Sequence, residues 1–337
     1  MSKLNVAVIF GGDSAECKSS INSAINVIDN LSREKYNIIP VYINDLGGWF
    51  LYEGKPHCIK AAEWENFGTR CQINLDRQEQ GFLRISGERV RNIPVDIAIP
   101  LLRGDFSEGS IQGALEMGGI KYVGAGVLAS ALASDRSMAK TLAKSLGITF
   151  PKYLVFDSKE LDDFDAMLRT VRYKIGYPCY IKPLKKGSLS SVLVSNKKEL
   201  EEAMIRAFLY SGKIIVEKEI KGRELVCTMF ALFDSLGFCE NSVKFCEIRE
   251  ALPDGEIFPA PVFDKKTMSK AKESAIALYG AMGISSPAHF KFFLDEQTKN
   301  VVLCDINTQL CFADSNILLK FMNTGEILDR LIANILR

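Results

Sequence analysis

The sequence has few of the residues that common metal and redox sites require. It contains only two histidines, His57 and His289, and its nine cysteines include no Cys-x-x-Cys pair, so a structural zinc site is not expected. The odd cysteine count, with no apolar leader ahead of the first predicted strand, argues against a disulfide framework. We therefore expect a reduced, cytoplasmic protein.

Excess charge and long apolar runs are also missing. The 337 residues carry a formal net charge of +1, which gives no electrostatic reason to expect nucleic acid or a membrane surface as partner. No apolar run reaches the roughly 20 residues that span a bilayer. There is no GxxxxGK[ST] motif, which excludes a P-loop protein. With 47% hydrophobic and 25% charged residues, the chain has an ordinary globular composition and suits two or three domains.

Buried strands that alternate with helices are the main pattern of the first part. Apolar segments predict strands at residues 5–10, 38–43, 49–52 and 95–102, with a helix after Gly12, whereas residues 54–92 are less regular. This alternation predicts an α/β unit with a mostly parallel sheet. Further on, we expect helices at 128–146, 198–209, 268–282 and 325–336, and strands at 180–183, 192–194 and 213–220.

A hairpin near the C-terminus carries the most informative polar residues. The segments AHFKFFLDEQTKN (288–300) and VVLCDINTQ (301–309) contain two apolar-alternating runs joined by a polar turn, which predicts a β-hairpin. This period puts His289 and Lys291 on one face of the first strand, and Asp305 and Asn307 on one face of the second. The last two are suitable ligands for Mg²⁺, but Lys291 is a cation, and we predict that it pairs with Asp305. A structural strand pair closed by a salt bridge is the simpler alternative.

Two further segments point to a nucleotide. In VEKEIKGREL (216–225), a strand end can present the Glu217 carbonyl and the Ile220 amide to an adenine edge, and Glu224 can accept ribose hydroxyl groups. Upstream, in IKPLKKGS (181–188), Lys182 lies on a strand before a glycine loop, a combination that suits a phosphate. Each segment alone is a common surface feature, so their order and spacing carry the prediction.

In this order the segments resemble the ATP-grasp enzymes, and most closely the D-alanine–D-alanine ligases. The resemblance runs through VAVIFGGDSAE (6–16), VDIAIPLLRG (95–104), SIQGALEMGGIKYVGAGVLASALASD (110–135), KPLKKGS (182–188) and DINT (305–308). It implies an α/β fold, α+β in its C-terminal half, with an N-terminal Rossmann-like domain (1–127), a central ATP-grasp lid domain (128–217) and a C-terminal ATP-grasp domain (218–337).

The resemblance also implies ATP held between the last two domains, two Mg²⁺ ions, D-amino acid substrates, a role in peptidoglycan precursor synthesis and a homodimer. It assigns nucleotide contacts to Arg136, Lys182, Gly187, Ser188, Glu217, Lys218, Ile220 and Glu224. For the first D-alanine, Glu16 matches the residue that anchors its ammonium, and Ser188 matches a lid-loop serine that orients it.

At the reacting centre the chain departs from the family pattern. Arg103 stands in place of a histidine, and His289 in place of an arginine that stabilises the tetrahedral intermediate. Lys291 replaces an aspartate that binds one metal, Asp305 shortens a bridging glutamate, and Asn307 is retained. A cation about 4 Å from Mg²⁺ repels it by several kcal/mol, even at an effective dielectric of about 20.

Three loops depart as well. The segment SEG (107–109) is one residue shorter than the family's GEDG, the lid loop GSLSS (187–191) lacks its second glycine, and Leu310-Cys311 replaces a Pro-Gly turn that forms an oxyanion hole. The loop bearing a catalytic Tyr-Lys pair is also missing. Loss of one oxyanion donor typically costs about 10²–10³ in rate.

We therefore weigh three functions. The first, which we place ahead, is a ligase-like protein with weak or lost activity that still binds a nucleotide or a D-amino acid. The second is an active ATP-dependent ligase that joins D-alanine to D-alanine or D-serine at an altered site. The third is a binding module that keeps the fold and acts on a protein partner. His289 also has a simple explanation as a hydrogen-bonded strand histidine without a catalytic part.

Overall fold

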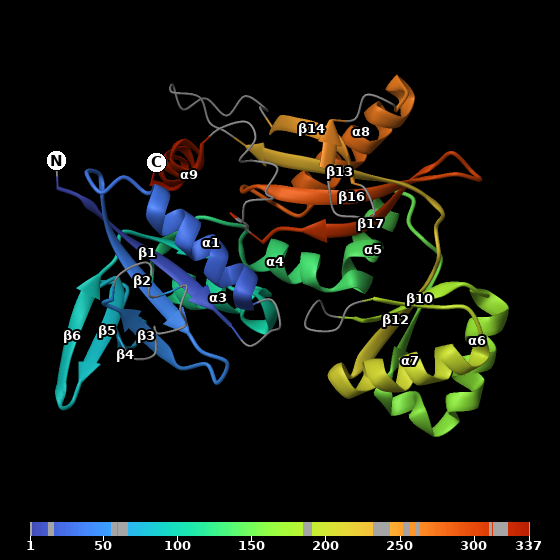
Figure 1. The fold of residues 1–337 in the computed structure, drawn as a ribbon, viewed down its shortest axis with the longest axis horizontal. Helices are drawn as coiled ribbons and strands as arrows, with labels where there is room; N and C mark the ends of the chain where they lie inside the picture. Colours follow the sequence, from blue (N-terminus) through green and yellow to red (C-terminus); the bar gives the residue numbers. More distant parts are fainter. Residues whose placement is uncertain are drawn as a thin grey trace.

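The computed structural model describes residues 2–12, 17–54, 59, 67–184, 191–231, 243–251, 257–259, 263–309, 312 and 323–336. Within these residues the strands form three sheets, and helices pack around each of them (Figure 1). No helix of the described part combines the length and the hydropathy that crossing a bilayer requires.

The N-terminal sheet has eight strands in the order β6-β5-β4-β3-β2-β1-β7-β8. Four of them pair in parallel: β1 (Leu4–Gly11), β2 (Tyr36–Ile43), β7 (Ile97–Pro100) and β8 (Lys121–Tyr122). Residues 6–10 of β1 are fully buried, as expected for a parallel strand covered on both faces. The predicted parallel sheet is therefore confirmed for this half.

The other half of this sheet is antiparallel and was not predicted in full. It consists of β3 (Trp49–Tyr52), β4 (Gly68–Asn74), β5 (Gly81–Ser86) and β6 (Arg89–Pro94). Of these, only β3 was expected, because β4, β5 and most of β6 lie in the stretch 54–92 that shows no regular apolar pattern. Strand β6 is an edge strand with mostly exposed residues, and charged, exposed edges give a weak sequence signal.

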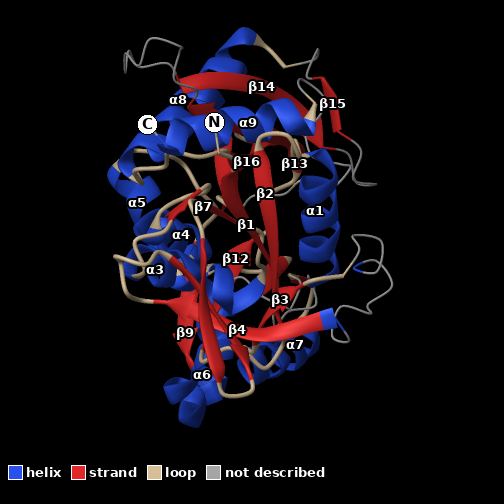
Figure 2. Ribbon diagram, turned by 90° about the vertical axis from the view of Figure 1, so that its left-hand side faces the viewer, coloured by secondary structure: helices blue, strands red, loops and turns tan. Residues whose placement is uncertain are grey.

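The C-terminal helix α9 (Thr324–Leu336) completes the N-terminal core. Its apolar face packs in one cluster with β1 and with α1 (Cys17–Asn30), and Figures 1 and 2 show α9 beside these elements. The contact is also polar, because Asp329 of α9 accepts hydrogen bonds from the Tyr36 hydroxyl at 2.8 Å and from Lys35 at 2.5 Å.

The central sheet is antiparallel, in the order β11-β10-β12-β9. Its strands are β9 (Tyr153–Asp157), β10 (Cys179–Pro183), β11 (Val192–Val194) and β12 (Lys213–Lys218). The helices α6 (Phe164–Lys174) and α7 (Lys197–Tyr210) share one apolar core with it. The predicted elements of this region are confirmed to within two residues.

The C-terminal sheet runs β15-β14-β13-β16-β17 and packs against α8 (Lys265–Ala281). Its strands are β13 (Gly222–Ala231), β14 (Val243–Ala251), β15 (Ile257–Pro259), β16 (Ala288–Asp295) and β17 (Val301–Asn307). The last two form the predicted hairpin, with His289 opposite Asn307 and Lys291 opposite Asp305.

The stretch predicted as one helix, 128–146, is two helices, α4 (Val127–Ser134) and α5 (Arg136–Ser145). The break falls at Asp135, which has an extended backbone and caps α5 by accepting hydrogen bonds from the backbone amides of Ser137 and Met138. Both helices pack into the core of the C-terminal sheet. The domain boundaries at 127 and 217 remain a prediction.

Candidate functional site

A buried group of charges joins the central sheet to α5. Glu217, at 3% side-chain exposure, lies between two ammonium groups, Lys182 at 2.6 Å and Lys140 at 3.0 Å. Burial alone raises the pKa of Glu217, but attraction by Lys140 and Lys182 outweighs it and holds the pKa below its ordinary value. The Glu217 carboxylate is therefore ionised. Together with the two lysine ammonium groups it forms a cluster with a net charge of +1.

Lys140 is a site residue that the sequence reasoning missed. It lies four residues after Arg136 in α5, so the two share one face of the helix. The Arg136 guanidinium donates a hydrogen bond to the Pro183 carbonyl at 2.7 Å, at the end of β10. Two basic residues of α5 therefore contact the central sheet beside Lys182, and their helical spacing was the available signal.

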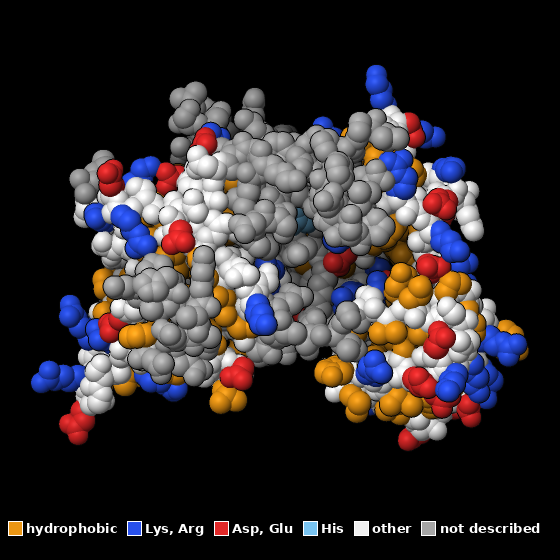
Figure 3. Space-filling view, in the orientation of Figure 1, with side chains coloured by type: hydrophobic (Ala, Val, Ile, Leu, Met, Phe, Trp, Pro, Cys, Tyr) orange, Lys and Arg blue, Asp and Glu red, His pale blue; other side chains and the backbone are white. Residues whose placement is uncertain are grey.

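Strand β17 faces this charge group. Burial raises the pKa of the Cys304 thiol to about 12, with Lys140 and Lys182 acting in the opposite direction and Glu217 and Asp305 adding to the rise. These interactions place the C-terminal hairpin across from the central sheet. Figure 3 shows this face of the molecule hollowed beside the central domain, at the lower right.

Two residues assigned to the adenine edge follow the charge group along the chain. Lys218 ends β12, is exposed, and donates its backbone N–H to the Lys152 carbonyl at 2.9 Å. Ile220 is half-buried just beyond the strand. No hydrogen bond involving the Ile220 amide is recorded within the described residues, so its assignment to a base stays a prediction.

Lys291 forms its ion pair with a residue that was not predicted as its partner. Its ammonium lies 3.1 Å from the Glu224 carboxylate of β13, the strand that pairs with β16. Asp305 is the backbone partner of Lys291 in the hairpin register, but the ion pair recorded for Lys291 is the one to Glu224. Glu224, assigned to a ribose, is therefore held by a cation of its own sheet.

His289 is a hydrogen-bonded strand histidine, as predicted. Its Nδ1 lies 2.8 Å from the Thr228 hydroxyl. Burial, together with the nearby cations Lys291 and Arg103, lowers the pKa of His289 to about 4. The ring is therefore neutral at pH 7 and differs in charge from the arginine that the resemblance places there.

Gln309 joins the N-terminal domain to the end of β17. Its carbonyl accepts a hydrogen bond from the Arg103 guanidinium at 2.5 Å, and its amide donates to the Ser107 hydroxyl. Its backbone N–H donates to Asn307 Oδ1 at 2.9 Å. Gln309 therefore joins Arg103, Ser107 and Asn307 in one hydrogen-bonded network, which we call the Gln309 bridge. Nothing in the sequence signalled this role for Gln309.

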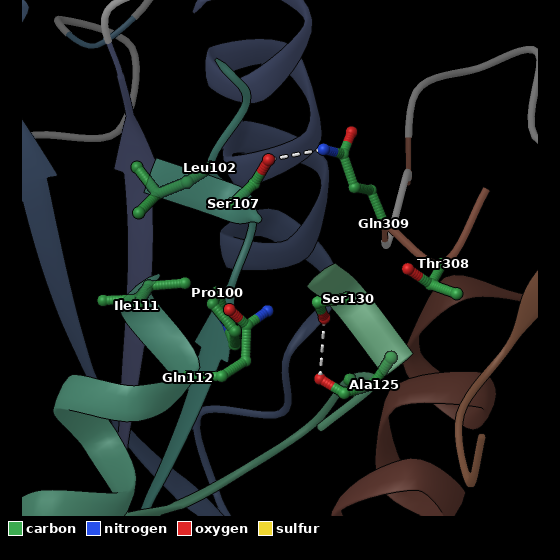
Figure 4. A pocket seen from close by; sticks show the side chains of 10 residues that line it. Pro100, Leu102, Ser107, Ile111, Gln112, Ala125, Ser130, Thr308 and Gln309 are labelled. Carbon is green, nitrogen blue, oxygen red and sulfur yellow. Dashed lines mark hydrogen bonds between the residues drawn. The ribbon is translucent and has the colours of Figure 1, made fainter. Parts of the chain in front are cut away.

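Two adjoining pockets lie beside the Gln309 bridge (Figure 4). Counting their open mouths, their empty volumes are about 320 and 220 Å³. Both are lined by Ser107, Ser130, Thr308 and Gln309. They therefore lie where the N-terminal domain, α4 and the end of β17 meet.

Comparisons with known proteins agree with this arrangement along the whole chain. Residues 5–125 match the family described as D-ala D-ala ligase N-terminus, and residues 142–337 match D-ala D-ala ligase C-terminus. The chain belongs to the D-alanine–D-alanine ligase family. A D-alanine–D-alanine ligase of Caldicellulosiruptor bescii is 32% identical over 99% of this chain and 95% of its own. One of a Thermoanaerobacter species is 32% identical over 91% and 88%.

Solved structures show the same ATP-grasp fold. The VanG D-Ala:D-Ser ligase from Enterococcus faecalis matches with a TM-score of 0.85 and 28% identity, over 98% of this chain and 99% of its own. The D-alanine–D-alanine ligase from Coxiella burnetii matches with a TM-score of 0.83 at 22% identity, over 100% of this chain and 94% of its own. The fold expected from the resemblance is therefore confirmed.

The residues present fit a nucleotide of this family better than its metal ions. The positive wall of Lys140, Lys182 and Arg136 suits phosphate groups. For Mg²⁺, the described residues contain no group of three or more carboxylate, histidine or cysteine side chains that could hold an ion. Lys291 stands on the strand opposite Asp305, and Asn307 Oδ1 is engaged by Gln309. The described residues therefore do not fit a two-metal site.

Three predicted residues cannot be placed. Glu16, Gly187 and Ser188 lie outside the described residues, so the proposed D-alanine ammonium anchor and the lid loop stay predictions. The Leu310-Cys311 segment lies outside them too.

Proposed function

We propose that this member of the D-alanine–D-alanine ligase family binds ATP between its central and C-terminal domains and has weak or lost ligase activity. The proposal keeps the domain division at 1–127, 128–217 and 218–337. ATP binding is supported by the buried pairs of Glu217 with Lys140 and Lys182, which fix a net positive wall, and by the ATP complex named for a Bacillus anthracis relative of the same fold.

The position of Lys291 carries the proposal of weak activity. Its ion pair with Glu224 at 3.1 Å holds a cation on the face where the family pattern has a metal ligand. His289, with a pKa of about 4, brings no positive charge to a developing oxyanion at pH 7. Both changes remove electrostatic stabilisation of the transition state, which is usually the largest single contribution to catalysis.

The test is ADP release from ATP and Mg²⁺ with D-alanine, D-serine and D-lactate. Wild type is compared with the double variant His289→Arg with Lys291→Asp, and with Lys270→Asp, the same charge reversal on the exposed face of α8. We expect the rates of ADP release by wild type and by Lys270→Asp to equal the background rate. The rate of the double variant should be equal to the background rate or higher. Clear wild-type turnover would overturn the proposal.

ATP binding is measured separately, by thermal stabilisation without a second substrate. At 100 times its Kd, a ligand stabilises the folded state by about 2.7 kcal/mol. We expect stabilisation of wild type and its reduction in Lys182→Met. If millimolar ATP does not raise the melting temperature of wild type, the proposed ATP binding is wrong. The third function, a binding module that keeps only the fold, is then favoured.

An active ligase is the second candidate, and one observation favours it. One structural neighbour, VanG from Enterococcus faecalis, is named as a D-Ala:D-Ser ligase and matches at 28% identity over nearly the whole chain. This candidate predicts ADP release with D-alanine plus D-serine, and dipeptide detected by mass spectrometry.

A further inference from the structure

Lys291 holds a cation on the face of the C-terminal sheet that points away from α8. Its neighbours in β16, Phe290 and Phe292, are fully buried in the core that contains α8. Because side chains alternate across a strand, Lys291 lies on the opposite face. Its side chain is 46% exposed, and its ammonium lies 3.1 Å from the Glu224 carboxylate of the adjacent strand β13. The ion pair therefore fixes a positive charge on an accessible part of this face.

The oxygen groups around Lys291 suit an ammonium better than a divalent metal ion. The Glu224 carboxylate binds the Lys291 ammonium, and Asn307 Oδ1 accepts the backbone N–H of Gln309 at 2.9 Å. Asp305 lies directly opposite Lys291 in the hairpin. Magnesium requires a nearly ideal shell of oxygen ligands, and a neighbouring ammonium repels it. A magnesium ion at this position would therefore have to displace Lys291 from its carboxylate partner.

The central domain and α5 supply further cations near this hairpin. Lys140 and Lys182 flank Glu217, and both act electrostatically on Cys304 of β17, so they lie close to the hairpin that carries Lys291. Figure 3 shows basic and acidic side chains gathered in the hollow beside the central domain. An ammonium has three N–H donors, so each lysine can donate to a phosphate as well as to its carboxylate partner. Such charge-assisted bonds bind phosphate oxygens without a metal ion.

We infer that Lys291 takes the place of a magnesium ion, so that this protein binds its nucleotide as free ATP rather than as the Mg²⁺ complex. The inference rests on the proposed ATP site and adds the cation requirement of that site. At a position where the family pattern has a metal ligand, the chain itself supplies the positive charge for the phosphate oxygens. Magnesium lowers the negative charge of ATP and is repelled by Lys291, so adding it should not strengthen binding.

The experiment measures the Kd of ATP for the full chain by isothermal titration calorimetry, in EDTA and in excess Mg²⁺ at equal ionic strength. No amino acid is added, so ligase turnover does not contribute to the heat. We expect the Kd in EDTA to be equal to the Kd in Mg²⁺ or lower. A Kd that is clearly lower in Mg²⁺ overturns the inference and keeps the proposed ATP site. Absence of binding in both buffers overturns the ATP site and the inference together.

Two variants at one position test the role of Lys291. Lys291→Met removes the charge, and the affinity for ATP in EDTA should fall about tenfold, the effect of one hydrogen bond to a charged group. Lys291→Asp reverses the charge, so this affinity should fall further, and Mg²⁺ should now strengthen binding. Lys270→Met, on the exposed face of α8, should behave as wild type in both buffers. Unchanged affinity in EDTA for both variants at position 291 overturns the inference.

Discussion

Replacing Glu217 with Gln tests the buried charge group most directly. The substitution keeps the shape of the side chain and removes the negative charge between Lys140 and Lys182. At 5% and 16% side-chain exposure, neither ammonium can regain full hydration. Breaking a buried ion pair by removing one partner costs about 3–5 kcal/mol, because the remaining charge stays buried. We expect a loss of this size in the free energy of unfolding.

The assay is urea unfolding at pH 7, followed by intrinsic fluorescence and by far-UV circular dichroism. Glu201→Gln, the same change on the exposed face of α7, is the matched control and should stay within about 0.5 kcal/mol of wild type. Adding Lys140→Met to Glu217→Gln should cost less than the sum of the single changes, because both remove the same ion pair. A loss below about 1 kcal/mol for Glu217→Gln would refute the reasoning.

The same variant has a predicted pH dependence. The folded-state pKa of Glu217 is lowered from its ordinary value of 4.5. Its ionisation therefore stabilises the fold above pH 4.5, and this contribution is lost as the pH falls through the lower folded-state pKa. Acid unfolding of Glu217→Gln should lack this component, so its stability should fall less steeply than that of wild type below pH 4.5.

Three further predictions follow from the polar contacts. In histidine NMR spectra, the signal that disappears in His289→Gln should titrate near pH 4, where burial and nearby cations place its pKa, and a midpoint near 6.5 would contradict this. Tyr36→Phe removes the hydroxyl bond to Asp329 and should cost about 1 kcal/mol in urea unfolding. Gln309→Ala removes the hydrogen bond that the Arg103 guanidinium donates and should cost about 1.5–3 kcal/mol, the range for hydrogen bonds to charged groups, whereas an unchanged midpoint of urea unfolding would show that the bridge does not stabilise the fold.

The hairpin shows what the sequence was able to predict. Alternation in polarity is a local property, so it predicted the two antiparallel strands that carry His289 and Lys291 on one side and Asp305 and Asn307 on the other, and the structure adds their register. It did not predict the ion pair of Lys291 with Glu224. That contact depends on the pairing of β13 with β16, and nothing in either strand's own pattern specifies its neighbour in the sheet.

The parts of the candidate site that were not predicted from the sequence depend on polar contacts between residues far apart in the chain. The strand lysine Lys182 was predicted to serve the site, but its buried partner Glu217 was assigned only a backbone role. Gln309 reaches Arg103 across 206 positions, and an amide side chain has no periodicity or charge pattern that reveals its partner. Strand β6 was missed for a different reason, because an exposed edge strand lacks an apolar repeat.

The return of α9 to the N-terminal domain constrains how the protein can fold as it is synthesised. The side chains of Ile327, Leu328, Leu331 and Ile332 belong to the same core as β1 and α1. Translation proceeds at about 5–20 residues per second, so the roughly 200 residues between that domain and α9 take on the order of 10–40 s. Throughout this time the first domain exposes the apolar surface that α9 later covers, and a nascent chain that stalls before residue 324 should be retained by chaperones.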